Sequence, residues 1–250
     1  MASELHVVAL PGMPEVTPGA DVAALVVDGV ARAGRSVDHG DVFVVAQKIV
    51  SKSEGALVRL DEVTPSARAV EWAAAYDKDA RVVEVVLRES ARVVRMERGI
   101  LIAETHHGFV CANAGVDASN VARGFVTLLP RDPDASAAWI RAALAAAFER
   151  DIAVIVSDTF GRPWREGVVN VALGVAGLRP LADYRGCRDV YGRELSSTVM
   201  AIADEIASAA ELVMRKTARL PVAIVRGAAD WIGSGRGAEL VRDAARDLFR

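Results

Sequence analysis

The sequence predicts an α+β fold, with mixed or antiparallel sheets and helices packed on them. Three observations carry this prediction. Short β-rich apolar runs recur along the chain, helical patterns lie between some of them, and the two kinds do not alternate regularly enough for a doubly wound sheet. With 250 residues, 52% of them hydrophobic, the chain is long enough for one large domain, 1–250, or for two closely packed subdomains within it.

The first elements are separated by strong turn signals. Residues 5–10 form a strand-like apolar run, and two clusters of Pro and Gly then interrupt the chain up to Gly19. Asp21 can cap a helix that continues to about Arg32. The apolar run 42–46 predicts a buried strand.

Helical and strand-like apolar patterns continue through the rest of the chain. Helices are expected at 70–76, 82–88, 132–147, 195–214 and 238–249. Strands are expected at 100–103, 109–112, 152–156, 168–176 and 221–225. Asp132 and Asp134 begin the third of these helices, where the helix dipole favours negative charge.

Two polar stretches, each following an apolar run, contain most of the chemistry-bearing residues. One is 113–120, with Asp117 and Asn120, and the other is 157–166, with Asp158-Thr159. An acidic residue just past a buried strand lies where a ligand can approach. Carboxylate and hydroxyl oxygens are the ligands that Mg²⁺ and Mn²⁺ prefer, so the two stretches could share one cation.

These two stretches also have simpler interpretations. Asp158-Thr159 could form an Asx or Ser/Thr turn that ends the strand, and Asp117 with Asn120 could be an ordinary turn or helix cap. Arg162 and Arg165 lie close to the acidic pair in sequence and suit a bound phosphate or carboxylate. Together these features favour a ligand site.

Other features are open to two interpretations. Lys52, one turn-length after Lys48, could hold phosphate oxygens or be a solvated lysine. The run 233–237 resembles a phosphate loop, but it lacks the full glycine-rich fingerprints, which favours a flexible connection. His106 and His107 would point to opposite faces of a strand, which favours surface or hairpin residues over metal ligands. A polar, aromatic stretch could line a pocket or form a turn; it contains Tyr184, Arg188, Asp189 and Tyr191.

Charge and composition exclude several classes of function. The net charge of −3 and pI near 5.9 give no electrostatic footprint for nucleic acid or an anionic membrane. Cys111 and Cys187 are far apart and lack metal-ligand spacing, which favours thiols in a reducing compartment. There is no apolar run of about 20 residues and no signal-peptide pattern, so we expect a cytoplasmic protein without a membrane span.

The sequence contains no common nucleophile or phosphate-loop signature. No Ser-His-Asp spacing, cysteine-nucleophile motif, zinc signature or P-loop is present. Oxygen-ligated cations and basic residues without a nucleophile suit phosphoryl transfer. Positioning and charge neutralisation do most of the catalysis in that reaction class.

Seven segments match, in the same order, the motifs of one known family. They are LPGMPE at 10–15, GDVFVVAQKIVSKSEG at 40–55, ANAGVDASNV at 112–121, LPRDPDAS at 129–136, SDTFGRPWREG at 157–167, ADEIA at 203–207 and PVAIVRG at 221–227. The chain therefore resembles the coenzyme F420-0:L-glutamate ligase family, the gamma-glutamyl ligases that build the glutamate tail of a deazaflavin coenzyme. The resemblance implies the family's own α+β fold and an intertwined homodimer.

The resemblance also implies an activity and a set of site residues. Members of this family use GTP and a divalent cation, Mg²⁺ or Mn²⁺, to join L-glutamate to coenzyme F420-0 through a gamma-linked amide, and K⁺ is an additional ion that the resemblance allows. By analogy the metal positions are Asp117, Asp158 and Thr159. The nucleotide-binding positions are Met13, Pro14, Glu15, Val16, Gln47, Lys52 and Asn120.

The expected reaction passes through an acyl phosphate. Arg162 and Arg165 are expected to hold the acidic substrates or stabilise the transferring group, and Glu166 to accept the proton of the attacking amine. Two departures from some relatives, at 168–170 and 189–192, could alter substrate contacts. The chain ends near 250 and would lack the nitroreductase-like domain of some bacterial relatives.

Two other functions fit the same residues. One is a related metal-dependent ligase or phosphotransferase that acts on another acidic acceptor. The other is a non-catalytic module that binds a nucleotide or deazaflavin.

Overall fold

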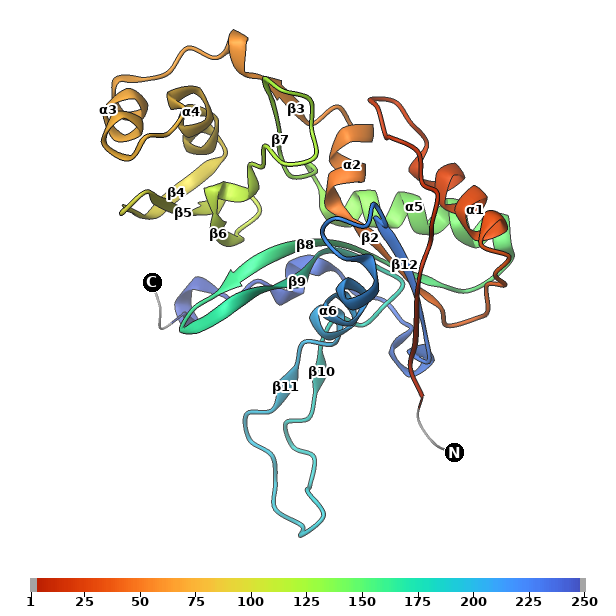
Figure 1. The fold of residues 1–250 in the computed structure, drawn as a ribbon. Helices are drawn as coiled ribbons and strands as arrows, with labels where there is room; N and C mark the ends of the chain where they lie inside the picture. Colours follow the sequence, from red (N-terminus) through yellow and green to blue (C-terminus); the bar gives the residue numbers. More distant parts are fainter. Residues whose placement is uncertain (1–3, 248–250) are drawn as a thin grey trace.

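The computed structural model describes residues 4–247 and is organised around one five-stranded sheet (Figure 1). In spatial order its strands are β1 (His6–Ala9), β12 (Val222–Arg226), β2 (Val42–Ala46), β8 (Ala153–Arg162) and β9 (Arg165–Ala176). In this sheet β2 and β8 are parallel and the other neighbouring pairs are antiparallel. The mixed sheet confirms the predicted α+β class, and five of the predicted strands belong to it.

Helices cover both faces of the sheet. α1 (Val22–Arg32), α2 (Gln47–Ser53) and α5 (Pro133–Phe148) pack on one face, and α6 (Ile202–Met214) packs on the other. Phe43 and Val154 contribute to the core under the three helices, whereas Val44 and Ile155 contribute to the core under α6. Strands that are buried on both faces have no polar face, which explains why their sequences are continuous apolar runs.

Side-chain caps begin two of the predicted helices. The Asp21 carboxylate accepts a hydrogen bond from the Ala24 amide at 3.0 Å, at the start of α1. The Asp132 carboxylate accepts one from the Ala135 amide at 3.0 Å, at the start of α5. Both caps satisfy amides that have no partner inside the helix, and both confirm the predicted starts.

Residues 57–127 form a smaller lobe with a hydrophobic core of its own. Its helices are α3 (Ala67–Tyr76) and α4 (Ala80–Arg88), close to the predicted positions. Its strands are β3 (Leu57–Arg59), β7 (Phe125–Thr127), β4 (Ser90–Glu97), β5 (Ile100–Thr105) and β6 (Val110–Ala112). β4 was not predicted, because irregularities in its pairing with β5 interrupt the alternation of apolar and polar residues.

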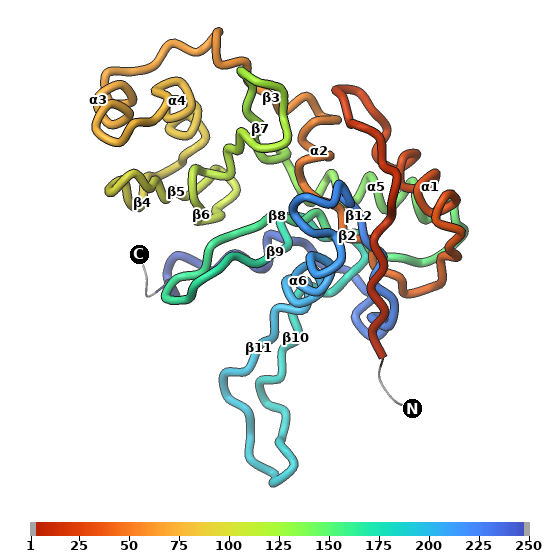
Figure 2. The backbone as a smooth tube through the Cα atoms, in the orientation of Figure 1, coloured from red at the N-terminus to blue at the C-terminus, as the bar shows by residue number. Residues whose placement is uncertain are grey.

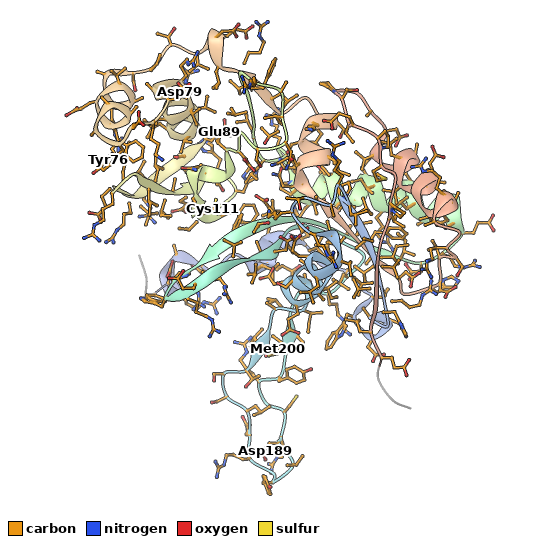
Figure 3. The ribbon with its side chains drawn as sticks, viewed as in Figure 1. Tyr76, Asp79, Glu89, Cys111, Asp189 and Met200 are labelled. Carbon is orange, nitrogen blue, oxygen red and sulfur yellow. The ribbon has the colours of Figure 1, made fainter. Side chains whose placement is uncertain are left out.

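A long arm extends away from the sheet between β9 and α6 (Figure 2). Its base is formed by β10 (Ala182–Asp183) and β11 (Val199–Met200), and Asp189 lies near its tip (Figure 3). The predicted start of the helix at 195–214 is wrong: α6 begins only at Ile202, and the residues before it belong to the arm. Ser, Thr and Val before that point are poor helix formers, and this strand of the arm pairs with the other, as in the hydrogen bond from the Tyr184 amide to the Thr198 carbonyl.

The helix predicted at 238–249 is also wrong for the residues that the structure describes. Short 3₁₀ turns at Gly237–Leu240 and Ala244–Arg246 take its place, after another at Ala229–Trp231, and Phe249 lies outside the described residues. The glycine-rich run 233–237 is a connection, as predicted, but it is packed against the sheet and is not a free loop. A Cβ on Gly237 would lie 2.4 Å from the Leu173 carbonyl oxygen, so this chain segment lies directly against β9.

None of the helices within 4–247 combines the length and the apolar character needed to cross a lipid bilayer.

Candidate functional site

The parallel pair of the sheet ends where the predicted site residues begin. β2 pairs with β8 as far as Ala46 opposite Ser157, and beyond that point β8 continues with β9 as a two-stranded ribbon. Asp158 and Thr159 are the first two residues of this continuation. They therefore lie within a strand and not just past its end, which corrects the sequence prediction and rules out the turn interpretation. The carboxyl end of a parallel strand pair is a common location for ligands.

α2 follows β2 without a loop and brings Lys48 to the same end of the sheet. The Lys48 ammonium donates to Asp117 Oδ2 at 2.6 Å, to the Ser119 carbonyl at 2.9 Å and to Ser119 Oγ at 2.7 Å. Asp117 belongs to the smaller lobe, where its backbone bridges to Thr127. Lys48 therefore fastens the Asp117 segment of the smaller lobe to the main sheet.

Asp117 is close enough to Asp158 for its charge to affect the ionisation of Asp158. The pKa of Asp158 is raised to about 6, chiefly by burial and to a smaller extent by the negative charge of Asp117. The Thr159 amide and the charges of Lys216 and Lys48 oppose that rise. Burial also works against ionisation of Asp117, but hydrogen bonds from Lys48 and from the Ser119 amide hold its pKa below the usual value. The two predicted acidic residues, distant in sequence, thus converge in one electrostatic cluster.

Thr159 is surrounded by residues that no sequence pattern indicated as ligands. The Lys216 ammonium donates to Thr159 Oγ1. Thr159 Oγ1 donates in turn to Asn170 Oδ1 at 2.8 Å, and Asn170 Nδ2 donates to Glu211 Oε2 at 3.2 Å. Glu211 and Lys216 lie on and just after α6, more than 40 positions from Thr159, and no local sequence signal links them to it. We call the group Asp117, Asp158, Thr159, Lys48 and Lys216 the convergent cluster.

The predicted nucleotide-binding residues surround α2 and the segment after β1. Lys52 pairs with Glu15, which ties that segment to the helix. Val16 is buried in the main core and Met13 packs against it. Gln47 is buried and accepts a hydrogen bond from Ser51 at 2.7 Å. The remaining two are Pro14, exposed beside Glu15, and Asn120, exposed three positions after Asp117.

Arg162, Arg165 and Glu166 lie at the tip of the β8–β9 hairpin. The Arg162 guanidinium donates to the Glu166 carbonyl at 2.5 Å, so it is bound to its own hairpin. At about 3.3 Å per residue, the Cα of Arg162 lies roughly 10–13 Å along the strand from Thr159 and Asp158. The structure thus separates these three residues from the convergent cluster, although sequence proximity suggested that they lie together.

The donor set of the convergent cluster suits a hard cation. Asp117 and Asp158 supply carboxylate oxygens of the kind that Mg²⁺ and Mn²⁺ bind. Thr159 is the next residue of the same strand, and its hydroxyl lies on the other face, against Asn170 and Lys216. Thr159 Oγ1 gives its proton to Asn170, so its lone pairs are directed toward the positive charge of Lys216. Within residues 4–247 no group of three or more His, Cys, Asp or Glu side chains is placed to hold a metal. A cation here would therefore need ligands from the substrate as well, such as phosphate oxygens.

Three further features can be assigned without a ligand. Cys111 faces β8 from the smaller lobe (Figure 3), and burial together with the charge of Asp158 raises the pKa of its thiol to about 12, which makes it unreactive. His106 and His107 lie in the turn between β5 and β6, as hairpin residues, and His107 Nε2 lies 3.0 Å from the Pro130 carbonyl oxygen. A hollow of about 890 Å³ lies between α1, α2 and α5, and none of the predicted site residues lines it.

Comparison with known proteins gives a consistent result over most of the chain. The family model described as F420-0:Gamma-glutamyl ligase matches residues 12–227. A coenzyme F420:L-glutamate ligase from Methanothermobacter thermautotrophicus is 46% identical over 250 residues, covering 98% of this chain and 99% of the relative. Proteins of the same name from Methanopyrus kandleri and Methanocaldococcus jannaschii are 45% and 43% identical, covering 98% and 86% of this chain and the same shares of the relatives.

Proposed function

The chain belongs to the F420-0:gamma-glutamyl ligase family, and we propose that it joins L-glutamate to coenzyme F420-0 through a gamma-linked amide, with GTP as the phosphoryl donor. The observation that carries the proposal is the convergence of Asp117 and Asp158 beside Lys48 and Lys216. The two carboxylates could hold a cation, and the positive charges of the two ammonium groups could attract phosphate oxygens. Both are needed to bring a triphosphate to an acidic acceptor.

The proposed reaction has two steps. An oxygen of the acceptor carboxylate attacks the γ-phosphorus of GTP, the bond to the β-phosphate oxygen breaks, and GDP leaves with the bonding electrons. The neutral amine of glutamate then attacks the carbonyl carbon of the acyl phosphate. The carbon–nitrogen bond forms, phosphate leaves, and a base or water accepts the amine's proton. Activation is required because a free carboxylate is a poor electrophile.

The chain's residues take distinct parts in this scheme. Lys52, now paired with Glu15 beside the segment that follows β1, is assigned to the β- and γ-phosphates. Arg162 and Arg165 on the hairpin tip are assigned to the acidic substrates, and Glu166 to the amine's proton. These three can reach the reacting atoms only if the hairpin tip of the same or a second subunit bends over the cluster.

Asp117, Asp158 and Thr159 would hold Mg²⁺ or Mn²⁺, with K⁺ as a further ion. Such an ion would neutralise charge on the phosphate oxygens and orient them. The raised pKa of Asp158 supports this assignment. Burial destabilises the ionised carboxylate, and a nearby cation would stabilise it more than it would stabilise a carboxylate in water.

Mass spectrometry of the product tests the proposed function. The protein is incubated with coenzyme F420-0, GTP, Mn²⁺ and L-glutamate, and the expected product is heavier than the acceptor by one or more glutamyl residues, with GDP formed in equal number. A ligase or phosphotransferase for another acidic acceptor would leave coenzyme F420-0 unchanged and form GDP with that acceptor. A binding module would form no GDP at all.

Replacement of Lys52 by Ala should weaken GTP binding by about 10- to 150-fold, because one charge-assisted contact to phosphate contributes about 1.5–3 kcal/mol. The Lys52 side chain is largely buried, but the fold should survive its truncation, because the carboxylate left without a partner is that of Glu15, whose side chain is 78% exposed. Isothermal titration with GTP in Mg²⁺ measures the change. The matched control is Lys78→Ala on the smaller lobe, and equal GTP affinity of the Lys52 variant and this control would contradict the assignment.

We also propose that the protein is a homodimer and that the arm between β10 and β11 contributes to its interface. Val190 and Tyr191 near the arm's tip are 93% and 92% exposed in the single chain, and exposed apolar residues on an extended arm favour a partner. The double variant Val190→Asp, Tyr191→Asp should sediment as a monomer at concentrations where the unmodified protein is a dimer. Ile100→Asp, on the smaller lobe, is the control. A double variant that remains fully dimeric would exclude the arm from the interface.

A further inference from the structure

Lys216 occupies a position in the convergent cluster that neither the sequence patterns nor the comparisons assign. It follows α6, whose last turn ends at Arg215 with a left-handed φ of 55°. From there its ammonium reaches Thr159 Oγ1 on β8. Its charge also opposes the rise of the Asp158 pKa that burial causes. Lys216 therefore contacts the cluster at Thr159, whereas Lys48 contacts it at Asp117.

A row of polar contacts between α6 and β9 fixes the place of Lys216. Asp204 accepts from the Ala172 amide at 2.8 Å, Ser208 Oγ donates to the Asn170 carbonyl at 2.7 Å, and Glu211 accepts from Asn170 Nδ2 at 3.2 Å. Residues four and three positions apart share one face of a helix. These contacts set the register of α6 along β9, and that register brings the end of the helix over Thr159.

The two lysines of the cluster differ in how they are held. Lys48 donates to three acceptors on Asp117 and Ser119, which uses all three N–H donors of an ammonium group. Lys216 is an exposed residue, and its contact with Thr159 uses one donor. Its flexible side chain can therefore contact an arriving anion while the cluster stays intact, whereas Lys48 would have to release Asp117 or Ser119.

We propose that Lys216 is a further catalytic residue, whose ammonium group contacts the phosphoryl group as it passes from the nucleotide to the acceptor carboxylate and neutralises part of its charge. This inference rests on the proposed function. Donors aimed at charge that develops in the transition state contribute about 10²–10³-fold each. The ammonium supplies charge and hydrogen bonds only, so it changes no atom or electron count in the two-step scheme.

The test uses the full-length protein with Lys216→Gln, Lys216→Arg and the control Arg219→Gln, an exposed residue of the same loop. Ligation is followed by GDP release. The phosphoryl-transfer step is followed separately, by exchange of ¹⁸O from the β,γ-bridging position of GTP in the presence of acceptor and Mg²⁺ without glutamate. GTP and Mn²⁺ affinities and thermal unfolding are measured for every variant.

Lys216→Gln should lower kcat and the isotope exchange together, by about 10²–10³-fold, with GTP and Mn²⁺ affinities within about threefold of the unmodified protein. Lys216→Arg keeps the charge, so its kcat should be at least tenfold higher than that of Lys216→Gln. The kcat of Arg219→Gln should stay within about twofold of that of the unmodified protein. Unchanged exchange in Lys216→Gln, or a loss explained by weaker Mn²⁺ binding, would overturn the assignment of Lys216. An unmodified protein that never cleaves GTP would overturn the proposed function, and this assignment with it.

Discussion

Replacement of Asp158 by Asn is expected to reduce glutamate ligation by about a thousandfold or more without loss of the fold. The amide has nearly the shape of the carboxylate but carries no charge for a cation. Stabilisation of transition-state charge by a bound cation amounts to several kcal/mol, and each 1.36 kcal/mol is tenfold in rate. The measurement is kcat for GDP release in the presence of coenzyme F420-0, glutamate and saturating GTP.

The same variant should be as stable as the unmodified protein, or more stable, at pH 7. Burial raises the pKa of Asp158 to about 6, so the ionised side chain is less favourable in the folded than in the unfolded state. An acid with a raised pKa in the folded state lowers the free energy of unfolding as the pH rises from its unfolded pKa to its folded pKa. Asn does not ionise, so the variant lacks this destabilisation. Such an exchange of stability for activity is typical of functional sites.

Asp61→Asn is the matched control for Asp158→Asn. Asp61 is an exposed carboxylate whose ion pair is with Arg59, on the smaller lobe. The ligation rate of Asp61→Asn should stay within about twofold of that of the unmodified protein. Comparable losses in Asp61→Asn and Asp158→Asn, or near-normal ligation by Asp158→Asn, would remove Asp158 from the site.

Replacement of Asp134 by Ala is expected to lower the free energy of unfolding by about 3–5 kcal/mol. Its carboxylate is buried and accepts from the amides of Val175 at 2.8 Å, Gly237 at 2.6 Å and Ala238 at 3.2 Å. The variant would leave these buried donors without partners, and each unsatisfied group costs about 1–3 kcal/mol. Urea unfolding followed by far-ultraviolet circular dichroism measures the loss.

Asp132→Ala provides the comparison, because it removes an ordinary helix cap two positions earlier. That change should cost about 1 kcal/mol. Asp134→Ala should therefore be the more harmful of the two by at least 2 kcal/mol. Equal losses would mean that Asp134 acts only on the helix dipole and does not fasten the C-terminal segment.

Asp134 illustrates what the sequence could and could not predict. Its place in the first turn of a helix was readable, because acidic residues there favour the dipole. Its contact with residues more than 100 positions later was not, because no local pattern specifies which distant amides a carboxylate will reach. The helix predicted near the C-terminus failed for the same reason, since the chain there is held against β9.

The convergent cluster likewise combines residues that local sequence patterns indicate with residues that only tertiary contacts bring there. Buried strands and their polar continuations were predictable from short apolar runs, which is why Asp117 and Asp158 were singled out. No sequence pattern distinguishes Lys48 from other lysines that follow a strand, and none points to Lys216. Both reach the cluster through tertiary contacts, one at the start of α2 and the other beyond the end of α6. Helix propensity could not set the register of α6, which depends on polar contacts with β9.

Binding of Mn²⁺ in the presence of GTP, measured by electron paramagnetic resonance, tests most directly whether Asp117 and Asp158 hold one cation against the triphosphate. The unmodified protein should bind at least one Mn²⁺ tightly, and Asp117→Asn and Asp158→Asn should each weaken that same binding by tenfold or more, with no further loss in the double variant. Full Mn²⁺ affinity in both single variants would contradict a shared site, as would losses that add independently.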